Sequence, residues 1–235
     1  MRAFNSAKFG QIQCVLFDLD GTLLDTAPDM IHALNRVLTD EQREPLPAAQ
    51  LRNQVSHGSA ALVEFVFGKD QSPKDFEDRK QRFLSYYQNR LCVDTVLFPG
   101  MAKLLDNIQA QGLSWGVVTN KPGWLTDPLM EQAGLMSSAV CVISGDSTAE
   151  RKPHPLPMLV AAKLANADPA NCLYVGDAER DIAAGNAANM TTVIANYGYI
   201  DAEQRREEWG ADGNIDHALE LDAWIRPHKA ADLAG

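Results

Sequence analysis

Short apolar runs that alternate with amphipathic stretches constrain the fold of this chain more than any other feature of its sequence. The apolar runs, each of strand length, cover residues 14–20, 113–120, 139–144, 172–177 and 191–196. The amphipathic stretches, each of helical length, cover residues 101–112, 123–134, 156–167 and 179–190. This alternation is typical of a parallel sheet with helices on both faces, so the sequence predicts an α/β fold. Gly112, Gly134 and Asn189 stand where helices should end, because Gly and Asn tolerate the left-handed conformation of a helix cap.

Residues 26–96 interrupt this alternation. They contain no strand-like run but several helical ones, among them APDMIHALNRVLTD (27–40) and DFEDRKQRFLSYYQNRL (75–91). We therefore expect a small α-helical cap domain over residues 26–96, inserted after the first strand. Residues 1–25 and 97–235 are expected to form a Rossmann-like core domain with a parallel sheet.

Composition and charge limit the classes of partner. The chain of 235 residues has a formal net charge of −10, whereas contact with nucleic acid or an anionic membrane calls for a basic face. We therefore expect neither partner, and no apolar run approaches transmembrane length. The four cysteines are scattered without a CxxC pair, and the N-terminus lacks the apolar core of a signal peptide. These features predict a cytoplasmic protein with reduced cysteines. We expect a monomer or a homodimer.

Two aspartates, Asp18 and Asp20, end the first apolar run in the stretch VLFDLDGTLLDT (15–26). Side chains alternate along a strand, so these two point the same way for as long as the strand continues. Two like charges held together in a protein interior are costly unless a cation or a proton joins them. Folding gives no reason for such a pair, which indicates a chemical role.

Other polar side chains follow the later strands, where open parallel sheets bind their ligands. These are Thr119, Asn120 and Lys121 after the second run, Lys152 in the stretch RKPHP, and Asp177 and Asp181 after the fourth run. Carboxylates and phosphate oxygens are ligands that Mg²⁺ favours, while ammonium, hydroxyl and amide donors hold the remaining phosphate oxygens. Singly, Asp177 and Asp181 suit the first turn of a helix, and Thr119 suits a strand. Together they predict a Mg²⁺-assisted phosphate site.

The stretches DLDGTLLDT, VVTNK, RKPHP and VGDAERDI resemble, in this order, the four motifs of the haloacid dehalogenase-like (HAD) phosphatases. The resemblance covers nearly the whole chain, and the helical insertion is similar to the small cap of that family. It implies that Asp18 is the nucleophile and forms an aspartyl-phosphate, while Asp20 protonates the leaving alkoxide and then activates water. It also implies that Mg²⁺ binds the carboxylates of Asp18 and Asp177 and the backbone carbonyl of Asp20, with Asp181 in support.

The same resemblance implies a set of groups that hold the phosphoryl oxygens. These are the side chains of Thr119 and Lys152 and the backbone amides of Leu19 and Asn120. Haloacid dehalogenases have no comparable acid/base aspartate at the position of Asp20. The resemblance therefore predicts a phosphatase of small phosphate esters.

Within the family, the chain looks most like phosphoglycolate phosphatases, and the N-acetylmuramic acid 6-phosphate phosphatases are also close. Its cap reads SHGS (56–59) where phosphoglycolate phosphatases usually carry a Gly-x-Gly loop. Both 2-phosphoglycolate and N-acetylmuramic acid 6-phosphate are therefore candidate substrates. His57 could hydrogen-bond the substrate or simply begin a helix, and Lys121 and Arg180 could bind a substrate carboxylate or pair at the surface.

Two rival functions stay open. A phosphosugar mutase of the β-phosphoglucomutase type also uses two such aspartates and this kind of cap. A non-catalytic phosphometabolite-binding module could keep the same fold. An assay with glucose 1-phosphate distinguishes a mutase from a phosphatase, because a mutase converts it to glucose 6-phosphate whereas a phosphatase releases phosphate.

Overall fold

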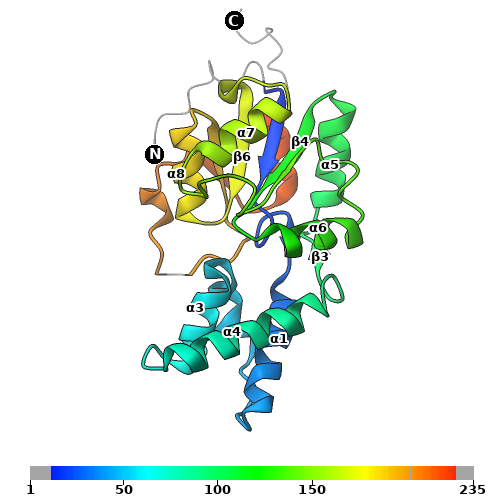
Figure 1. The fold of residues 1–235 in the computed structure, drawn as a ribbon. Coiled ribbons are helices and arrows are strands. Elements are labelled where there is room, and N and C mark those ends of the chain that lie inside the picture. The colour runs from blue at the N-terminus through cyan, green and yellow to red at the C-terminus, as the bar shows by residue number, and fades with distance from the viewer. Residues whose placement is uncertain (1–11, 202, 226–235) are drawn as a thin grey trace, which may run out of the picture.

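The computed structural model describes residues 12–201 and 203–225, and its main sheet has six strands in the order β5-β4-β1-β6-β7-β8 (Figure 1). The strands are β1 (Cys14–Phe17), β4 (Ser114–Val118), β5 (Val142–Ile143), β6 (Cys172–Gly176), β7 (Thr191–Ala195) and β8 (Gly213–Ile215). All neighbouring strands run parallel, which confirms the predicted sheet. The sequence does not predict β8, because its three residues, GNI, give no apolar signal.

The strand β1 lies inside the sheet, with hydrogen bonds to β4 on one side and to β6 on the other. All four of its residues are fully buried. Val15 and Phe17 pack into one hydrophobic cluster, whereas Cys14 and Leu16 pack into a second one. A strand covered on both faces needs this continuous apolar run, and its carboxyl end lies between those of β4 and β6.

Helices cover both faces of the sheet (Figure 1). The larger ones are α5 (Met101–Ala110), α6 (Gly123–Gln132), α7 (Leu156–Leu164) and α8 (Glu179–Ala187). Residues of α5 and α6 join the hydrophobic cluster of Val15, and residues of α7 and α8 join that of Cys14. Gly112, Gly134 and Asn189 follow α5, α6 and α8 with φ angles of 74°, 71° and 61°, as their predicted cap role requires. The remaining short elements are η3 (Pro169–Asn171), η4 (Arg206–Glu208), η5 (Ala218–Leu221) and α9 (Asp222–Ile225).

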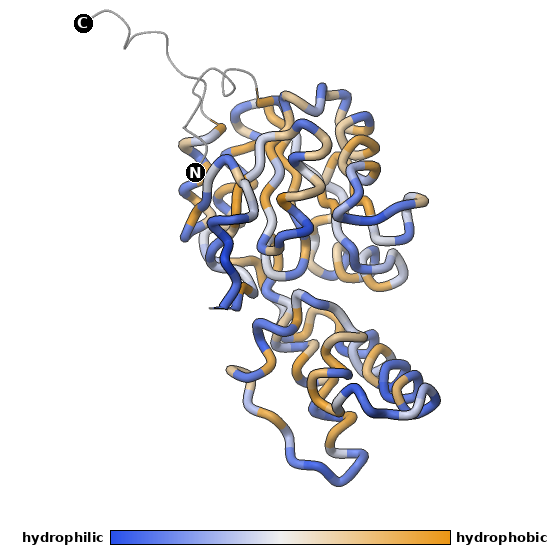
Figure 2. Tube along the Cα trace, turned by 90° about the vertical axis from the view of Figure 1, so that its left-hand side faces the viewer, coloured by the Kyte–Doolittle hydropathy of each residue, from blue (hydrophilic) through white to orange (hydrophobic). Residues whose placement is uncertain are grey.

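A second group of helices lies beyond one end of the sheet strands, where it forms the lower part of the molecule in Figures 1 and 2. It consists of α1 (Ala27–Asp40), α2 (Ala48–Leu51), η2 (Arg52–His57), α3 (Gly58–Phe67) and α4 (Pro73–Gln88). Leu34 of α1, Leu62 of α3 and Phe83 of α4 are fully buried. These helices match the predicted helical content of residues 26–96, and we keep the division into a cap domain and a core domain as a prediction. Within the described residues, no helix is long and apolar enough to cross a membrane.

The two chain segments that join the helical group to the sheet lie side by side. They form a short antiparallel pair, β2 (Leu24–Asp25) and β3 (Val96–Leu97), in which Leu24 faces Leu97. Each of these strands has two residues, which is too short for a sequence pattern to reveal. The pair places the helical group over the carboxyl ends of β1 and β4, next to the residues of the predicted site (Figure 1).

Candidate active site

Four loops at the carboxyl edge of the sheet carry most of the predicted site residues, while Asp181 lies in the first turn of α8. Asp18 follows β1, Thr119 follows β4, and Asp177 follows β6. Because β4, β1 and β6 are adjacent and parallel, these three loops meet at one point. Lys152 comes from the loop before α7 and reaches the same point.

Three buried carboxylates converge there. Asp18, Asp177 and Asp181 each offer an oxygen atom, and these atoms all lie within 4.8 Å of one another. Burial, together with repulsion from Asp18 and Asp181, raises the pKa of Asp177 to about 8. Burial also raises the pKa of Asp181 above its ordinary value, although Lys152 opposes the shift. The cluster therefore carries more negative charge than the buried site tolerates, and a cation bound by oxygen atoms would relieve it.

Lys152 is a cation that the protein itself supplies in direct contact with this cluster. Its Nζ atom lies 2.8 Å from Oδ1 of Asp18 and 2.8 Å from Oδ1 of Asp181. The carbonyl oxygen of Val118 and the hydroxyl of Tyr174 are also 2.8 Å from Nζ. Lys152 is thus held by four oxygen atoms, in contact with Asp18.

Asn120 fixes the loop that carries this lysine. Its Nδ2 donates to the carbonyl oxygen of Lys152 at 2.9 Å, and its Oδ1 accepts from the backbone N–H of Lys152 at 3.1 Å. The sequence predicts only the backbone amide of Asn120 as a functional group. Its side chain adds a second task, because it ties the loop after β4 to the loop before α7.

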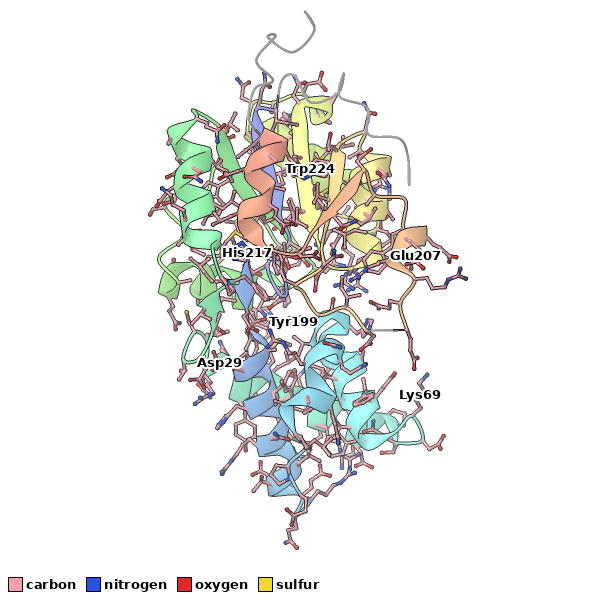
Figure 3. All side chains as sticks on the ribbon, turned by 180° about the vertical axis from the view of Figure 1, so that it is seen from behind. Asp29, Lys69, Tyr199, Glu207, His217 and Trp224 are labelled. Atoms are coloured by element: carbon pink, nitrogen blue, oxygen red, sulfur yellow. The ribbon has the colours of Figure 1, made fainter. Side chains whose placement is uncertain are left out.

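The loop around Gly21 packs directly against Asp177. Gly21 has a φ of +84°, and a Cβ atom there would lie 2.2 Å from Oδ2 of Asp177. That same oxygen accepts from the backbone N–H of Tyr199 at 2.8 Å. The Tyr199 hydroxyl donates to Oδ1 of Asp25 at 2.8 Å, and Figure 3 shows this tyrosine where the sheet meets the helical group. Tyr199 lies outside the four motifs and is not among the predicted site residues, although the run YGYI (197–200) after β7 contains it.

Asp20 does not belong to the carboxylate cluster. Its Oδ1 accepts from the Thr26 hydroxyl at 2.6 Å and from Nζ of Lys121 at 2.9 Å. The Lys121 Nζ also donates to the hydroxyl of Tyr87, on α4, at 2.9 Å. The two aspartates of the first motif thus pair with different lysines, Asp18 with Lys152 and Asp20 with Lys121.

A cavity of about 710 Å³ lies between the sheet edge and the helical group. Asp18, Asp20, Thr119 and Lys152 line it from the sheet side, whereas Asp177 and Asp181 do not. Residues 55–60 of η2 and α3, together with the α4 side chains Phe83, Leu84 and Tyr87, line it from the helical side. The cavity is therefore large enough for a sugar-sized ligand and exposes Asp18 to it.

A family model described as haloacid dehalogenase-like hydrolase matches residues 15–195 of this sequence. The chain belongs to the haloacid dehalogenase-like hydrolase family. It is 42% identical to the N-acetylmuramic acid 6-phosphate phosphatase of Pseudomonas putida, over 90% of this chain and 95% of that protein. It is 40% identical to a phosphoglycolate phosphatase of Xanthomonas campestris, over 92% of this chain and 98% of that protein.

Solved structures give the same family assignment. A predicted phosphoglycolate phosphatase from Haemophilus somnus superposes with a TM-score of 0.82 at 27% sequence identity, covering 92% of this chain and 99% of that one. The resemblance read from the four motifs is confirmed, and so is the prediction of an enzyme that hydrolyses phosphate esters.

Two further predicted residues line the cavity of this HAD site, His57 from the helical group and Arg180 from α8, which packs on the sheet. His57 stands at the N-terminus of α3 without a side-chain hydrogen bond to the helix, and it lines the cavity. Arg180 also lines the cavity, and its Nη2 donates to the carbonyl oxygen of Ser56 at 2.8 Å and lies 3.3 Å from the Ser56 hydroxyl. Leu19, whose amide is expected to bind phosphate, is fully buried between Asp18 and Asp20. Their roles toward a substrate stay predictions.

Proposed function

We propose that this HAD enzyme is a Mg²⁺-dependent phosphomonoesterase that uses Asp18 as its nucleophile. The observation that carries the proposal is the position of Asp18, which belongs to the buried carboxylate cluster and also lines the cavity. A nucleophilic carboxylate needs access to the substrate on one side and charge compensation on the other. Lys152 supports that compensation, because its Nζ contacts Oδ1 of Asp18.

The carboxylate cluster fits Mg²⁺ by the chemistry of its donors. Asp18, Asp177 and Asp181 supply hard oxygen ligands within 4.8 Å of one another, and all three are buried. The backbone carbonyl of Asp20 is a further ligand that we propose for the ion. Mg²⁺ bound there would neutralise charge on the phosphoryl oxygens during transfer.

The proposed reaction has two steps, and Asp18 and Asp20 take part in both. In the first step, a carboxylate oxygen of Asp18 forms a bond to phosphorus while the ester bond breaks, and Asp20 gives a proton to the departing oxygen. In the second, Asp20 takes a proton from water, whose oxygen attacks phosphorus and releases phosphate from Asp18. Thr119, Lys152 and the backbone amide of Asn120 hold the phosphoryl oxygens throughout.

For the substrate we propose N-acetylmuramic acid 6-phosphate, with 2-phosphoglycolate as the second candidate. Relatives that carry both names support the pair. The cavity of about 710 Å³ favours the sugar, because glycolate would fill only a small part of it. Trp124 lines the cavity, is 45% exposed and offers apolar surface to a sugar ring, while Arg180 offers a charge to a carboxylate.

We further propose that the enzyme acts in the cytoplasm as a monomer or a homodimer. All four cysteines are free, and Cys14, Cys141 and Cys172 are buried. Reduced thiols of this kind suit a reducing compartment. Gel filtration of the purified chain would decide the oligomeric state.

The test is phosphate release from both candidate esters, side by side, with Mg²⁺ and with EDTA, measured as kcat/KM. Asp18→Asn should abolish turnover without changing the circular dichroism spectrum, while Asp106→Asn, on the exposed face of α5, serves as the matched control. An Asp18→Asn variant with near-normal activity would refute the nucleophile. Incubation with glucose 1-phosphate tests the mutase alternative, because formation of glucose 6-phosphate would support a mutase and release of phosphate alone would exclude it.

A further inference from the structure

A buried lysine and a tyrosine of the helical group meet beside the proposed proton-transfer residue. The Lys121 side chain is 5% exposed, and its Nζ lies 2.9 Å from Oδ1 of Asp20 and 2.9 Å from the Tyr87 hydroxyl. The ammonium also lies 4.5 Å from the centroid of the Tyr87 ring. Tyr87 is buried on α4, where its ring stacks on Phe83. The contact therefore joins the loop after β4 to a helix that comes from the other side of the cavity.

The two oxygen atoms of Asp20 have different surroundings. Oδ1 accepts from both Thr26 and Lys121. Oδ2 receives no hydrogen bond from the part of the chain that the structure describes, and the Asp20 side chain lines the cavity. Two donors on one oxygen fix the rotation of the carboxylate, so the second oxygen is held in a set direction and is free to exchange a proton.

We propose that Lys121 is a positioning residue for Asp20, and that the Tyr87 hydroxyl aligns Lys121 for this task. The pair acts on both proton transfers of Asp20, and the first of them, to the departing ester oxygen, is the one that kcat/KM reports. This inference rests on the acid/base role proposed above for Asp20. The inference adds that the position of α4 at the cavity affects how well Asp20 protonates a poor leaving group.

The charges around the contact are consistent with this role. Burial would lower the pKa of the Lys121 ammonium, but Asp20 and Tyr87 raise it above its ordinary value, so it stays charged. Burial raises the pKa of Tyr87 to about 12, so its hydroxyl keeps its proton at neutral pH and accepts from Lys121. The alternative is a purely structural ion pair, whose loss would weaken all reactions of the enzyme equally.

The dependence of kcat/KM on the leaving group distinguishes a positioning role of Lys121 from a purely structural one. An alkyl phosphate needs a proton on its departing oxygen, whereas p-nitrophenyl phosphate releases a stable phenolate without one. Because kcat/KM reports the steps up to leaving-group departure, the ratio of kcat/KM for the two esters isolates the proton transfer. The alkyl ester is an alkyl phosphate without a carboxylate that the wild-type enzyme hydrolyses, such as glucose 6-phosphate, so that a direct contact of Lys121 with a substrate carboxylate cannot change the ratio.

Lys121→Met should lower kcat/KM for the alkyl ester by about 100-fold, since positioned acid/base groups contribute on that scale, and change it only about threefold for p-nitrophenyl phosphate. Tyr87→Phe removes one oxygen atom and should lower the alkyl value roughly threefold to tenfold, the range of a single hydrogen bond, with little change in the aryl value. The matched controls are Tyr86→Phe, whose hydroxyl instead contacts Asp40, and Lys103→Met on the exposed face of α5. Neither control should change the ratio.

The outcomes are distinct from those of the proposed function. If the wild-type enzyme shows no Mg²⁺-dependent phosphatase activity on any of these esters, the proposed function fails and this inference fails with it. If the wild-type enzyme is active but the ratio is unchanged in both variants, only the positioning role is overturned. Melting temperatures of all variants are measured first, and if Lys121→Met does not fold, Tyr87→Phe alone decides.

Discussion

Replacement of Asp29 by asparagine should destabilise the protein more than its position at the start of a helix suggests. Asp29 is fully buried in the first turn of α1, close to the junction with the sheet (Figure 3). Its carboxylate accepts from the backbone N–H groups of Val93, Asp94 and Thr95, with Oδ2 lying 3.1, 3.0 and 2.9 Å from the three nitrogen atoms. It also accepts from the Thr95 hydroxyl at 2.8 Å, and Nε of Arg90 lies 3.1 Å away. One carboxylate thus binds the whole segment that leads into β3.

The expected cost follows from these contacts. An asparagine of the same shape would present an NH₂ group, in place of one oxygen, to donors that need an acceptor, and it would leave Arg90 with Asp94 as its partner. Hydrogen bonds to a charged group contribute about 1.5–3 kcal/mol each, so the loss of two of them costs about 3–6 kcal/mol. For a chain of this size that loss lowers the melting temperature by roughly 10 °C.

Urea unfolding followed by circular dichroism gives the free energy of unfolding of Asp29→Asn against the wild type. Asp106→Asn is the control, and we expect it to change stability by less than about 0.5 kcal/mol, because Asp106 is exposed on α5. A loss below about 1 kcal/mol for Asp29→Asn would refute the reasoning, since that is the scale of a single net hydrogen bond.

Two further predictions concern pH and metal. Hydrogen bonds from Arg79, and to a smaller extent from Arg82, lower the pKa of Glu41 in the folded protein below its usual 4.5. The stability that these bonds contribute is therefore complete above pH 4.5, and it is lost as pH falls through the lower pKa of the folded protein. Glu41→Gln should therefore lower the free energy of unfolding in urea at neutral pH by about 1 kcal/mol or less, and the difference should shrink as pH falls progressively below 4.5; an equal difference at neutral and at acid pH would contradict this. Mg²⁺ at roughly 100 times its dissociation constant should stabilise the chelator-treated wild type by about 2.7 kcal/mol, a rise of about 5–10 °C in melting temperature. Asp177→Asn should lose most of that rise, and an undiminished rise would place the ion elsewhere.

Local patterns predict the parallel sheet and the ends of its helices, because both depend on periodicity and on single residues. The apolar runs give the strands, and Gly112, Gly134 and Asn189 mark helix ends, as their positive φ angles show. The strand pair of β2 and β3 escapes prediction, because two residues each carry no period. Its existence depends on contacts between segments more than 70 residues apart, such as Leu24 with Leu97.

The contacts that orient the site residues were also beyond the reach of the sequence. Tyr199 donates its backbone N–H to Asp177, and Tyr87 accepts from Lys121, but neither tyrosine belongs to one of the four motifs. Motifs identify the residues that touch the substrate, since chemistry restricts their types. The residues that aim them are restricted only by shape and hydrogen bonding, which many side chains satisfy, so a single sequence does not mark them.

The surroundings of Asp18 and Asp20 depend on the residue at which the strand β1 ends. A side-chain period of two places them on the same side of a strand, and the repulsion between them then calls for a shared cation. In the structure, however, β1 ends at Phe17, so both aspartates lie beyond the strand and that period does not govern them. Asp18 meets Lys152, 134 residues away along the chain, and Asp20 meets Lys121, 101 residues away. The protein thus compensates each charge separately, which leaves Asp18 to the carboxylate cluster and lets Asp20 stand apart from it, as a nucleophile and a proton donor with separate tasks require.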